Sequence, residues 1–262
     1  MSNDKVHINE LSLSFGDKTN DLKVLNNITL NIPTSETLVI LGPSGCGKST
    51  LLKLIGGINL DAKISGIIKI DDKKPDDFKK DGKVGFAFQN PVMLRWRNVY
   101  ENVILPLELK GILTEKDKIK TIETLKITGI EDFKNAFPNE LSGGMKQRVN
   151  LARTIVHNPE LLLLDEPFGS LDELSRLKLN YELREIIKTN SFTTILITHS
   201  LREAILLGDR IVILSHRPAS LYKSFIPHLD SEIKVGIETT LEFNQELKKL
   251  TDLFLELENG KK

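Results

Sequence analysis

The sequence of 262 residues is poor in several features that define large classes of protein. It contains one cysteine, Cys46, which excludes a disulfide framework and a multi-cysteine metal site. It also lacks an excess of either charge, because Lys and Arg together number 36 and so do Asp and Glu. A net charge of zero gives no overall positive field that would draw the chain onto nucleic acid or anionic lipid.

Long apolar runs are missing as well. No run approaches the roughly 18 apolar residues that a membrane-spanning helix needs. The opening segment MSNDKVHINE has no apolar stretch of the kind found in a secretory signal. We therefore expect that, if the protein works at a membrane, another chain crosses it.

Short apolar segments of strand length are present. The composition, 40% hydrophobic and 27% charged, is that of an ordinary globular protein. The apolar segments alternate with segments of helical pattern, which predicts a mainly parallel sheet with helices on both faces. The expected strands are TLVIL (37–41), GIIKI (66–70), LLLLDE (161–166), TTILITH (193–199) and RIVILS (210–215).

Three other regions depart from this alternation. Near the N-terminus, apolar and polar residues alternate as in β structure, and KVLNNITLNI follows with a turn expected at Asn26-Asn27. Residues 91–140 look helical and more polar, with breaks expected at Pro106, Gly111 and Pro138, which predicts a helical insertion.

The third region is the C-terminal tail, which carries an amphipathic helix pattern. The stripe spans only two heptads, too few to argue a coiled coil. Two interpretations stay open: a helix packed on its own domain, or a dimerisation or regulatory element. The apolar positions are Phe243, Leu247, Leu250, Phe254 and Leu257.

The segment GPSGCGKST fits the pattern G-x-x-x-x-G-K-S/T between a predicted strand and a predicted helix. Glycines let the backbone wrap closely, so that N–H groups point at a phosphate, and the helix N-terminus adds a positive end. We expect Lys48 to pair with β- and γ-phosphate oxygens and the Ser49 hydroxyl to bind Mg²⁺. A plain glycine-rich turn is the alternative, which the flanking strand and helix disfavour. The predicted nucleotide-binding residues are Gly42, Pro43, Ser44, Gly45, Cys46, Gly47, Lys48, Ser49 and Thr50.

Hydrolysis of a nucleotide also needs a polarised water. Asp165, at the end of the strand LLLLDE, is placed to hold Mg²⁺, and Glu166 to accept a proton from the attacking water. Adjacent carboxylates at a strand end are also common as solvated charges. The upstream phosphate-binding motif favours the catalytic interpretation.

Three further candidates are weak when each is taken alone. His199 follows the strand TTILIT and could contact the γ-phosphate or the water, although a lone histidine is more often structural. Gln89, in VGFAFQNP, is a candidate ligand of Mg²⁺ or of the water. Phe15 could stack on an adenine, although one aromatic in an alternating strand is usually a core residue.

A second small-residue turn, Ser142-Gly143-Gly144, opens the basic, helix-like segment MKQRVNLARTI. It is either a simple turn or a second anion site at a helix N-terminus.

Together, these segments resemble the motifs of ATP-binding cassette (ABC) ATPases. Gly42–Thr50 is similar to the Walker A motif, LSGGM (141–145) to the family signature, and SLD (170–172) to the D-loop. In the same way Gln89 matches the Q-loop, LLLLDE matches Walker B with its catalytic glutamate, and His199 matches the switch histidine. The motifs stand in the family order, and their span from Phe15 to His199 covers most of the chain.

The resemblance implies a fold of the α/β class. It is that of a P-loop NTPase with a mainly parallel core sheet, an N-terminal antiparallel β subdomain and an inserted α-helical subdomain at about residues 91–142. It places an ABC ATPase domain at residues 1–226 and a C-terminal extension with the amphipathic helix at residues 227–262.

The resemblance also implies ATP and Mg²⁺ as cofactors and a head-to-tail homodimer with ATP between the two copies. Ser142, Gly143 and Gly144 would contact the γ-phosphate held by the other copy, and Asp172 would couple the two sites. The implied catalytic residues are Glu166, His199 and Gln89, the implied metal ligands are Ser49, Gln89 and Asp165, and the implied adenine stack is Phe15.

The segments LSGGMKQRV and THSLREAILLGDRIVILSHRP resemble most the ATPase subunits of bacterial nitrate, sulfonate and taurine importers. Arg95 and Ser200 stand where that group usually has Pro and Asp, and neither change removes a phosphate or metal ligand. Met145 replaces the Gln of the general signature and is usual in this subgroup.

The subgroup implies an ATP-hydrolysing subunit that energises uptake of a small solute through a separate integral membrane permease. It implies a peripheral position on the cytoplasmic face of the inner (plasma) membrane, an indirect link to a periplasmic or lipid-anchored solute-binding protein, and no nucleic acid. Met93, Leu94, Trp96 and Arg97 either line a groove for the permease or pack inside the helical subdomain. Nothing in the chain names the solute, because specificity in such importers lies in other subunits.

Two alternatives belong to other classes. One is a soluble, non-transport ABC ATPase of DNA repair or translation. Repair-type members carry long coiled coils between the P-loop and the signature, and the 93 residues from Ser49 to Ser142 leave no room for them (142 − 49). The other is a nucleotide sensor without turnover, which would lack Glu166 or His199, and both are present.

Overall fold

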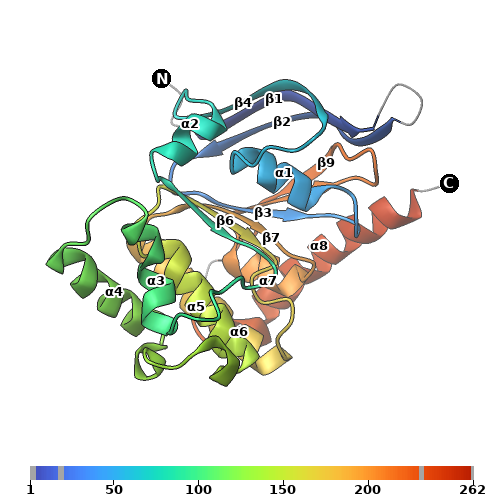
Figure 1. The fold of residues 1–262 in the computed structure, drawn as a ribbon. Coiled ribbons are helices and arrows are strands. Elements are labelled where there is room, and N and C mark those ends of the chain that lie inside the picture. The colour runs from blue at the N-terminus through green and yellow to red at the C-terminus, as the bar shows by residue number, and fades with distance from the viewer. Residues whose placement is uncertain (1–3, 17–20, 230–232, 261–262) are drawn as a thin grey trace.

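The central layer of the molecule is a six-stranded sheet (Figure 1). The structure is a computed structural model that describes residues 4–16, 21–229 and 233–260. The strand order is β5-β6-β7-β3-β8-β9, in which the first five strands run parallel and β9 is antiparallel to β8. The strands are β3 Thr37–Leu41, β5 Val84–Ala87, β6 Leu161–Asp165, β7 Thr193–Ile197, β8 Arg210–Leu214 and β9 Leu221–Phe225.

Apolar side chains cover both faces of this sheet, as the continuous apolar runs predicted. Every residue of β3, β6 and β7 is buried. Alternate residues enter different core clusters, because successive side chains of a strand point to opposite faces. In β3, Val39 and Leu41 belong to one cluster, and Leu38 and Ile40 to the other.

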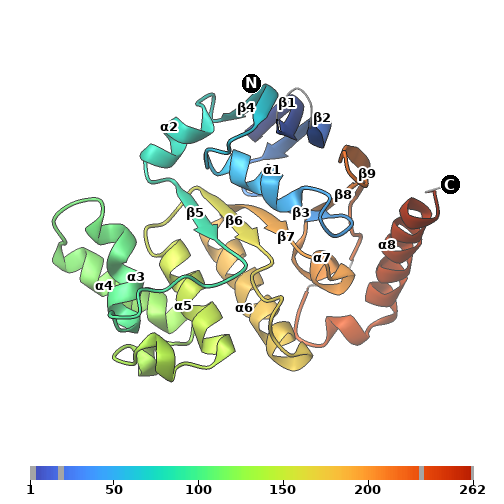
Figure 2. The ribbon, with the colours of Figure 1, turned by 45° about the vertical axis from the view of Figure 1, so that its right-hand side comes forward.

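Helices cover one face of the sheet, and a helix with a second sheet covers the other (Figure 2). The first face packs against residues of four helices, α5, α6, α7 and α8. The second face packs against α1 and the N-terminal sheet. The helices are α1 Lys48–Ile55, α5 Gly143–Ile155, α6 Glu173–Asn190, α7 Leu201–Leu207 and α8 Leu241–Asn259.

The N-terminal sheet is antiparallel, with the order β2-β1-β4. Its strands are β1 Asp4–Phe15, β2 Leu22–Pro33 and β4 Lys63–Ile70. The turn expected at Asn26-Asn27 is wrong, because β2 continues through it. Instead, the pairing of β1 with β2 shifts register between Leu25 and Ile28, which are both fully buried. β2 has one more residue than β1 in this stretch, which makes a β-bulge, and Asn27 adopts φ 52° within it.

The region 91–140 is helical, as predicted. It contains α3 Val99–Glu108, α4 Glu115–Ile127 and the 3₁₀ helices Glu131–Phe133 and Pro138–Glu140. With α5 it forms a core cluster of its own. Pro106 does not end α3 but lies in its last turn, since the buried side chain of Leu107 holds that turn in the cluster.

The remaining helices are α2 Pro75–Lys80, the 3₁₀ helix Ile237–Thr239 and α8. The stripe predicted in the tail lies on α8, which packs against α7. Phe243, Leu250 and Leu257 are buried in the core, and Leu247 and Phe254 are partly buried beside it. Across the described ranges, no helix combines the length and apolarity that a membrane span requires.

Candidate functional site

The loop between β3 and α1, residues 42–49, has a backbone that only glycine tolerates at key positions. Gly45 and Gly47 have φ angles of 70° and 122°, in the region that L side chains rarely adopt. A Cβ added at Gly47 would lie 2.8 Å from Val24 Cγ1 and 3.0 Å from Leu25 Cδ2. Strand β2 therefore holds the loop closely. We call residues 42–49 the P-loop after the motif, and their binding of phosphate stays a prediction.

Lys48 belongs to the P-loop and is also the first residue of α1. Its side chain is buried, and Nζ donates to the carbonyl oxygens of Gly42 at 2.8 Å and Pro43 at 2.9 Å. An ammonium group has three donors, so one remains after these two bonds. The lysine thus holds the P-loop closed while keeping a positive charge beside the cradle.

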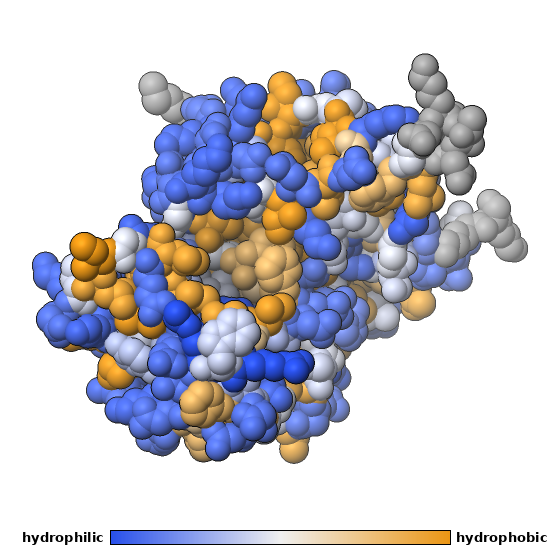
Figure 3. Space-filling model, viewed as in Figure 1, coloured by the Kyte–Doolittle hydropathy of each residue, from blue (hydrophilic) through white to orange (hydrophobic). Residues whose placement is uncertain are grey.

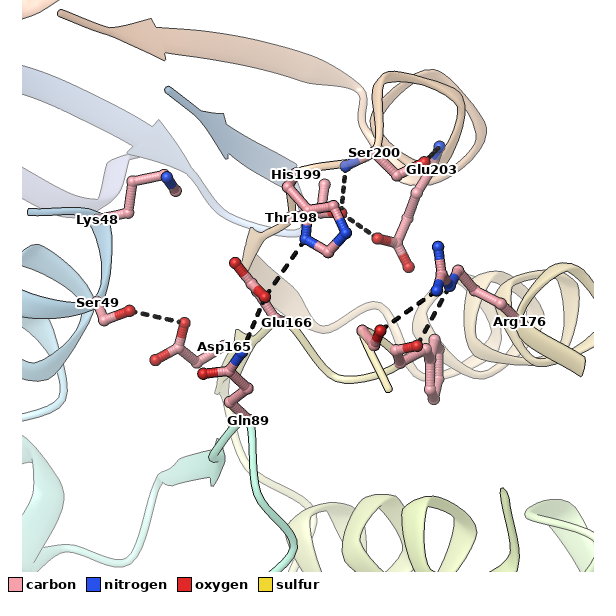
Figure 4. A network of polar contacts seen from close by, with 12 residues as sticks. Lys48, Ser49, Gln89, Asp165, Glu166, Arg176, Thr198, His199, Ser200 and Glu203 are labelled. Atoms are coloured by element: carbon pink, nitrogen blue, oxygen red, sulfur yellow. Dashed lines mark hydrogen bonds and ion pairs between the residues drawn. The ribbon is translucent and has the colours of Figure 1, made fainter. Parts of the chain in front are cut away.

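Ser49 and Asp165 bring two oxygen atoms together next to the cradle (Figure 4). Ser49 Oγ donates to Asp165 Oδ1 at 3.0 Å, and the carboxylate is only 6% exposed. Burial raises the pKa of Asp165, the neighbouring Glu166 adds to the rise, and the Ser49 hydrogen bond opposes it. A buried carboxylate without a full counter-charge, beside a hydroxyl, fits a hard cation such as Mg²⁺.

Such a cation would keep several of its own waters. Within the described part of the chain, no three His, Cys, Asp or Glu side chains gather at one point. Mg²⁺ typically binds one or two carboxylates and completes its shell with water and phosphate. The amide oxygen of Gln89 faces the side of Asp165 in Figure 4, which leaves it available as a further ligand.

Two predicted residues, Gln89 and His199, meet at the side chain of Glu166. Gln89 Nε2 donates to Glu166 Oε2 at 3.0 Å, and His199 Nδ1 lies 3.4 Å from the same oxygen (Figure 4). The Glu166 backbone has φ 46°, unusual for a residue other than glycine, and its N–H donates to Ile197 O at 3.0 Å. A strained residue held by its surroundings at a cluster of polar groups is typical of a functional site.

Ser142 and Asp172 have local roles within the single chain. Ser142 caps α5 by accepting from Met145 N at 3.3 Å, and Asp172 caps α6 by accepting from Ser175 N at 3.0 Å. This bond lowers the pKa of Asp172. A Cβ added at Gly143 would lie 3.7 Å from Leu171 Cδ2, so the signature turn and the D-loop are neighbours. Contact of Ser142, Gly143, Gly144 and Asp172 with a second copy stays a prediction.

Phe15 and Cys46 take part in packing. Phe15 is half-buried beside the core cluster that includes Val24 and Leu25, and its stacking on adenine stays a prediction. Cys46 is 1% exposed, and burial raises the pKa of its thiol although Lys48 lowers it. The contribution of Cys46 to a nucleotide site is therefore through its backbone.

Sequence reasoning missed three residues that support these loops. Arg176 donates to the backbone of the D-loop region, Glu203 accepts from Thr198 beside the switch histidine, and Arg217 donates to Gly45 O of the P-loop. The only sequence signal for Arg176 is its place one helical turn after Asp172. Nothing local marks Arg217, which is 172 residues away from Gly45 along the chain.

Comparisons with known proteins agree with the resemblance. The family profile described as ABC transporter matches residues 25–169. The chain is 38% identical over 250 residues, 95% of its length and 91% of the relative's, to an uncharacterized ABC transporter ATP-binding protein of Methanocaldococcus jannaschii. It is 42% identical over 218 residues to the aliphatic sulfonates import ATP-binding protein SsuB of Bacillus cereus, covering 83% of this chain and 84% of that one.

Further similarity extends to taurine transport and to solved structures. The taurine import ATP-binding protein TauB of Roseobacter denitrificans is 38% identical over 245 residues, 92% of this chain and 87% of that protein. The solved dimeric structure of MJ0796, a bacterial ABC transporter cassette, superposes with a TM-score of 0.74 at 30% identity, covering 86% of this chain and 99% of that one. The chain therefore belongs to the ABC transporter family, as the ATP-hydrolysing cassette that its motifs predicted.

Proposed function

We propose that this cassette energises a bacterial importer of small sulfonate-like or taurine-like solutes through a separate membrane permease. The observation that carries the proposal is the meeting of Gln89 and His199 on Glu166, beside Ser49 and Asp165. A cassette equipped in this way for turnover resembles relatives named for the import of aliphatic sulfonates and taurine. The non-transport alternative is not favoured by these similarities.

In the proposed mechanism, the P-loop binds the phosphates of ATP, and three side chains beside it would hold Mg²⁺. Backbone N–H groups of the P-loop and Lys48 Nζ bind the β- and γ-phosphate oxygens of ATP. Ser49 Oγ, Asp165 and Gln89 Oε1 would hold Mg²⁺, which supplies charge neutralisation on the phosphate oxygens when bound. Asp165 is deprotonated in this role, and a nearby cation favours that form.

Glu166 acts as general base in this proposal. Its Oε2 accepts a proton from the attacking water, and Gln89 Nε2 and His199 orient the carboxylate. The Glu166 to His199 separation of 3.4 Å leaves a long, weak contact, which permits the imidazole to turn toward a γ-phosphate. Phe15 stacks on the adenine ring.

The complete site takes two copies of the chain. In the proposed dimer, the signature residues Ser142, Gly143 and Gly144 of one copy contact the γ-phosphate bound by the P-loop of the other, and Asp172 links the two sites. The dimeric arrangement of the MJ0796 cassette supports this assembly. Closure then requires ATP, which ties hydrolysis to movement.

The permease is proposed to dock near α3. Figure 3 shows apolar side chains over this part of the molecule. They surround a hollow between the helical region that contains α3 and the part of the molecule that contains α2. A cavity of about 440 Å³ lies there, and the Leu109 side chain at its edge is 80% exposed. Its lining combines apolar residues with the charged side chains Lys79, Lys110 and Arg153. An exposed apolar surface of this kind suits a protein partner.

Met93, Leu94, Trp96 and Arg97 were expected either to line a groove for the permease or to pack inside the helical subdomain. Of these four, Trp96 is the residue that faces outward, at 74% exposure. Met93 packs in the helical cluster, and Arg97 forms an ion pair with Glu108 on α3. Trp96 is therefore the proposed contact, with the cassette on the cytoplasmic face of the membrane. A solute-binding protein would act from the other side without touching it.

Co-purification tests the transport proposal. Mild solubilisation of membranes is expected to recover the wild-type cassette with an integral membrane protein, and Trp96→Glu is expected to reduce that recovery strongly. Leu241→Glu, at a side chain that is 75% exposed on α8, is the matched surface control and is expected to leave recovery unchanged. Recovery of the cassette with ribosomes or DNA instead of a membrane protein would contradict the importer proposal.

A further inference from the structure

Two charged residues of neighbouring helices lie directly behind the catalytic loops. Arg176 comes from α6 and Glu203 from α7. Figure 4 shows the guanidinium and the carboxylate pointing toward one another. The mechanism proposed above gives neither residue a task.

Arg176 holds the loop that follows Glu166. Its Nε donates to Phe168 O at 3.2 Å, and its Nη2 donates to Gly169 O at 3.3 Å and to Leu171 O at 2.7 Å. The same loop is tied to the catalytic residue, because Gly169 N donates to Glu166 O at 3.2 Å. One side chain thus fixes the whole path from Glu166 to the D-loop.

Glu203 holds the loop that carries His199. Its carboxylate is 5% exposed and accepts from Thr198 Oγ1, which in turn accepts from Ser200 N at 3.0 Å. These bonds fix the backbone on both sides of His199. Burial raises the pKa of Glu203, and the positive charge of Arg176 is among the influences that lower it.

We propose that Arg176 and Glu203 are positioning residues for hydrolysis, and that their mutual attraction sets the separation of Glu166 and His199. The inference rests on the catalytic roles proposed for those two residues. Because Arg176 governs one loop and Glu203 the other, the pair spans the gap across which Glu166 Oε2 and His199 Nδ1 lie 3.4 Å apart. A displacement of about 1 Å at such a site is enough to lower a rate by up to about a hundredfold.

Conservative variants separate positioning from simple stability. Arg176→Lys keeps the charge, but one ammonium does not reproduce a planar fork on three carbonyls. Glu203→Gln keeps the shape and an acceptor for Thr198, and loses the attraction to Arg176. We expect each change to lower kcat by roughly tenfold or more, while KM for ATP changes by less than about threefold.

Matched controls exist on the same framework. Arg184 is a second arginine of α6, is buried, and donates to Leu206 O of α7, away from the catalytic loops. Glu246 is a buried carboxylate of α8, paired with Lys249 at 2.6 Å. Arg184→Lys and Glu246→Gln are expected to lower the melting temperature without changing kcat. If kcat instead falls in step with melting temperature across all four variants, the two residues have only a structural role and the proposal is wrong.

The double variant tests the attraction itself. Arg176→Gln removes the positive charge, so if the two residues act together, the loss of kcat in Arg176→Gln with Glu203→Gln is smaller than the product of the two single losses. A loss equal to that product, or a kcat within about twofold of wild type in either single variant, would overturn the proposal. If Glu203→Gln does not fold, the kcat of Arg176→Lys alone tests the positioning role, and a value within about twofold of wild type overturns it.

The variant Glu166→Gln distinguishes failure of the positioning role from failure of the proposed role of Glu166 as general base. Abolished turnover in Glu166→Gln together with normal kcat in Arg176→Lys refutes only the positioning role. Normal turnover in Glu166→Gln refutes the catalytic assignment as well.

Discussion

At the scale of single residues, the site depends on backbone shapes that are unfavourable outside their setting. Glu166, with its left-handed backbone, is held by a hydrogen bond to β7 and by the loop that Arg176 fixes. Gly47 is held against Val24 of β2. Fixed groups of this kind do not need to reorganise when charge develops at a reacting phosphate, and this lowers the barrier.

Gly47→Ala tests the shape of the P-loop. The new Cβ would meet Val24 Cγ1 at 2.8 Å in a left-handed backbone, so we expect a loss of about 1–3 kcal/mol in unfolding free energy. Displacement of the loop is also expected to lower ATP affinity, measured by equilibrium binding of a fluorescent analogue.

Gly111→Ala is the control for that experiment. Gly111 also has a positive φ, 141°, but no atom lies within 4 Å of an added Cβ. A similar loss of stability is expected there with unchanged ATP affinity. Unchanged affinity in Gly47→Ala as well would show that the P-loop does not need its observed shape.

His157 gives the molecule a pH-dependent stability. Its Nε2 lies 3.1 Å from Val84 O, and burial lowers its pKa to about 4. Between roughly pH 6.5 and 4, His157 is protonated in the unfolded chain but stays neutral in the folded chain. The free energy of unfolding therefore falls as the pH falls through this window. At pH 5 this effect of His157 lowers the free energy of unfolding by about 2 kcal/mol relative to its value at neutral pH. Urea unfolding at pH 7 and pH 5 should show a smaller difference in His157→Gln than in wild type, and equal differences would contradict the burial of a neutral imidazole.

At the scale of elements, α8 is a structural part of the cassette. Its apolar stripe lies in the same core cluster as residues of α6 and α7. Its far end reaches the P-loop side of the molecule, where Glu258 Oε1 lies 3.4 Å from His216 Nε2, next to Arg217. The interpretation of the tail as a helix packed on its own domain therefore accounts for its apolar face.

Paired substitutions on α8 test this packing. Leu250 is fully buried, so Leu250→Ala is expected to lower the unfolding free energy by about 2–5 kcal/mol. Leu255 is 51% exposed, and Leu255→Ala is expected to change it by less than about 0.5 kcal/mol. Chemical unfolding of the monomer measures both. Equal, small effects would mean that α8 is not docked in solution.

At the scale of the whole molecule, the two half-sites of the proposed dimer belong to different elements of the chain. The P-loop lies at the end of β3, and the signature turn opens α5 within the helical region. Within one copy, Ser142 and Asp172 cap their own helices. A helix N-terminus that is capped by a small polar side chain still presents its positive end outward, which suits a phosphate held by a second copy.

Much of this arrangement could be predicted from the sequence, because it depends on local patterns. Continuous apolar runs predicted the buried strands β3, β6, β7 and β8, and the family resemblance implied one site for Asp165, Glu166, Gln89 and His199. The placement of GIIKI in the parallel sheet was wrong, because this segment is the end of β4 in the antiparallel sheet, and the short strand β5 was missed. The support behind them could not be predicted, since contacts such as those of Arg176 depend on tertiary packing. The bulge at Asn27 was missed for the same reason: buried neighbours on both sides override local turn preference.

The central claim is that ATP joins two copies of this chain. Glu166→Gln should bind ATP without turning it over, so its mass by light scattering is expected to double when MgATP is added. Adding Ser142→Arg to this variant should leave ATP binding intact and keep the mass at that of one chain. A Glu166→Gln cassette that binds ATP and stays a monomer, or a dimer that Ser142→Arg does not disturb, would contradict the claim.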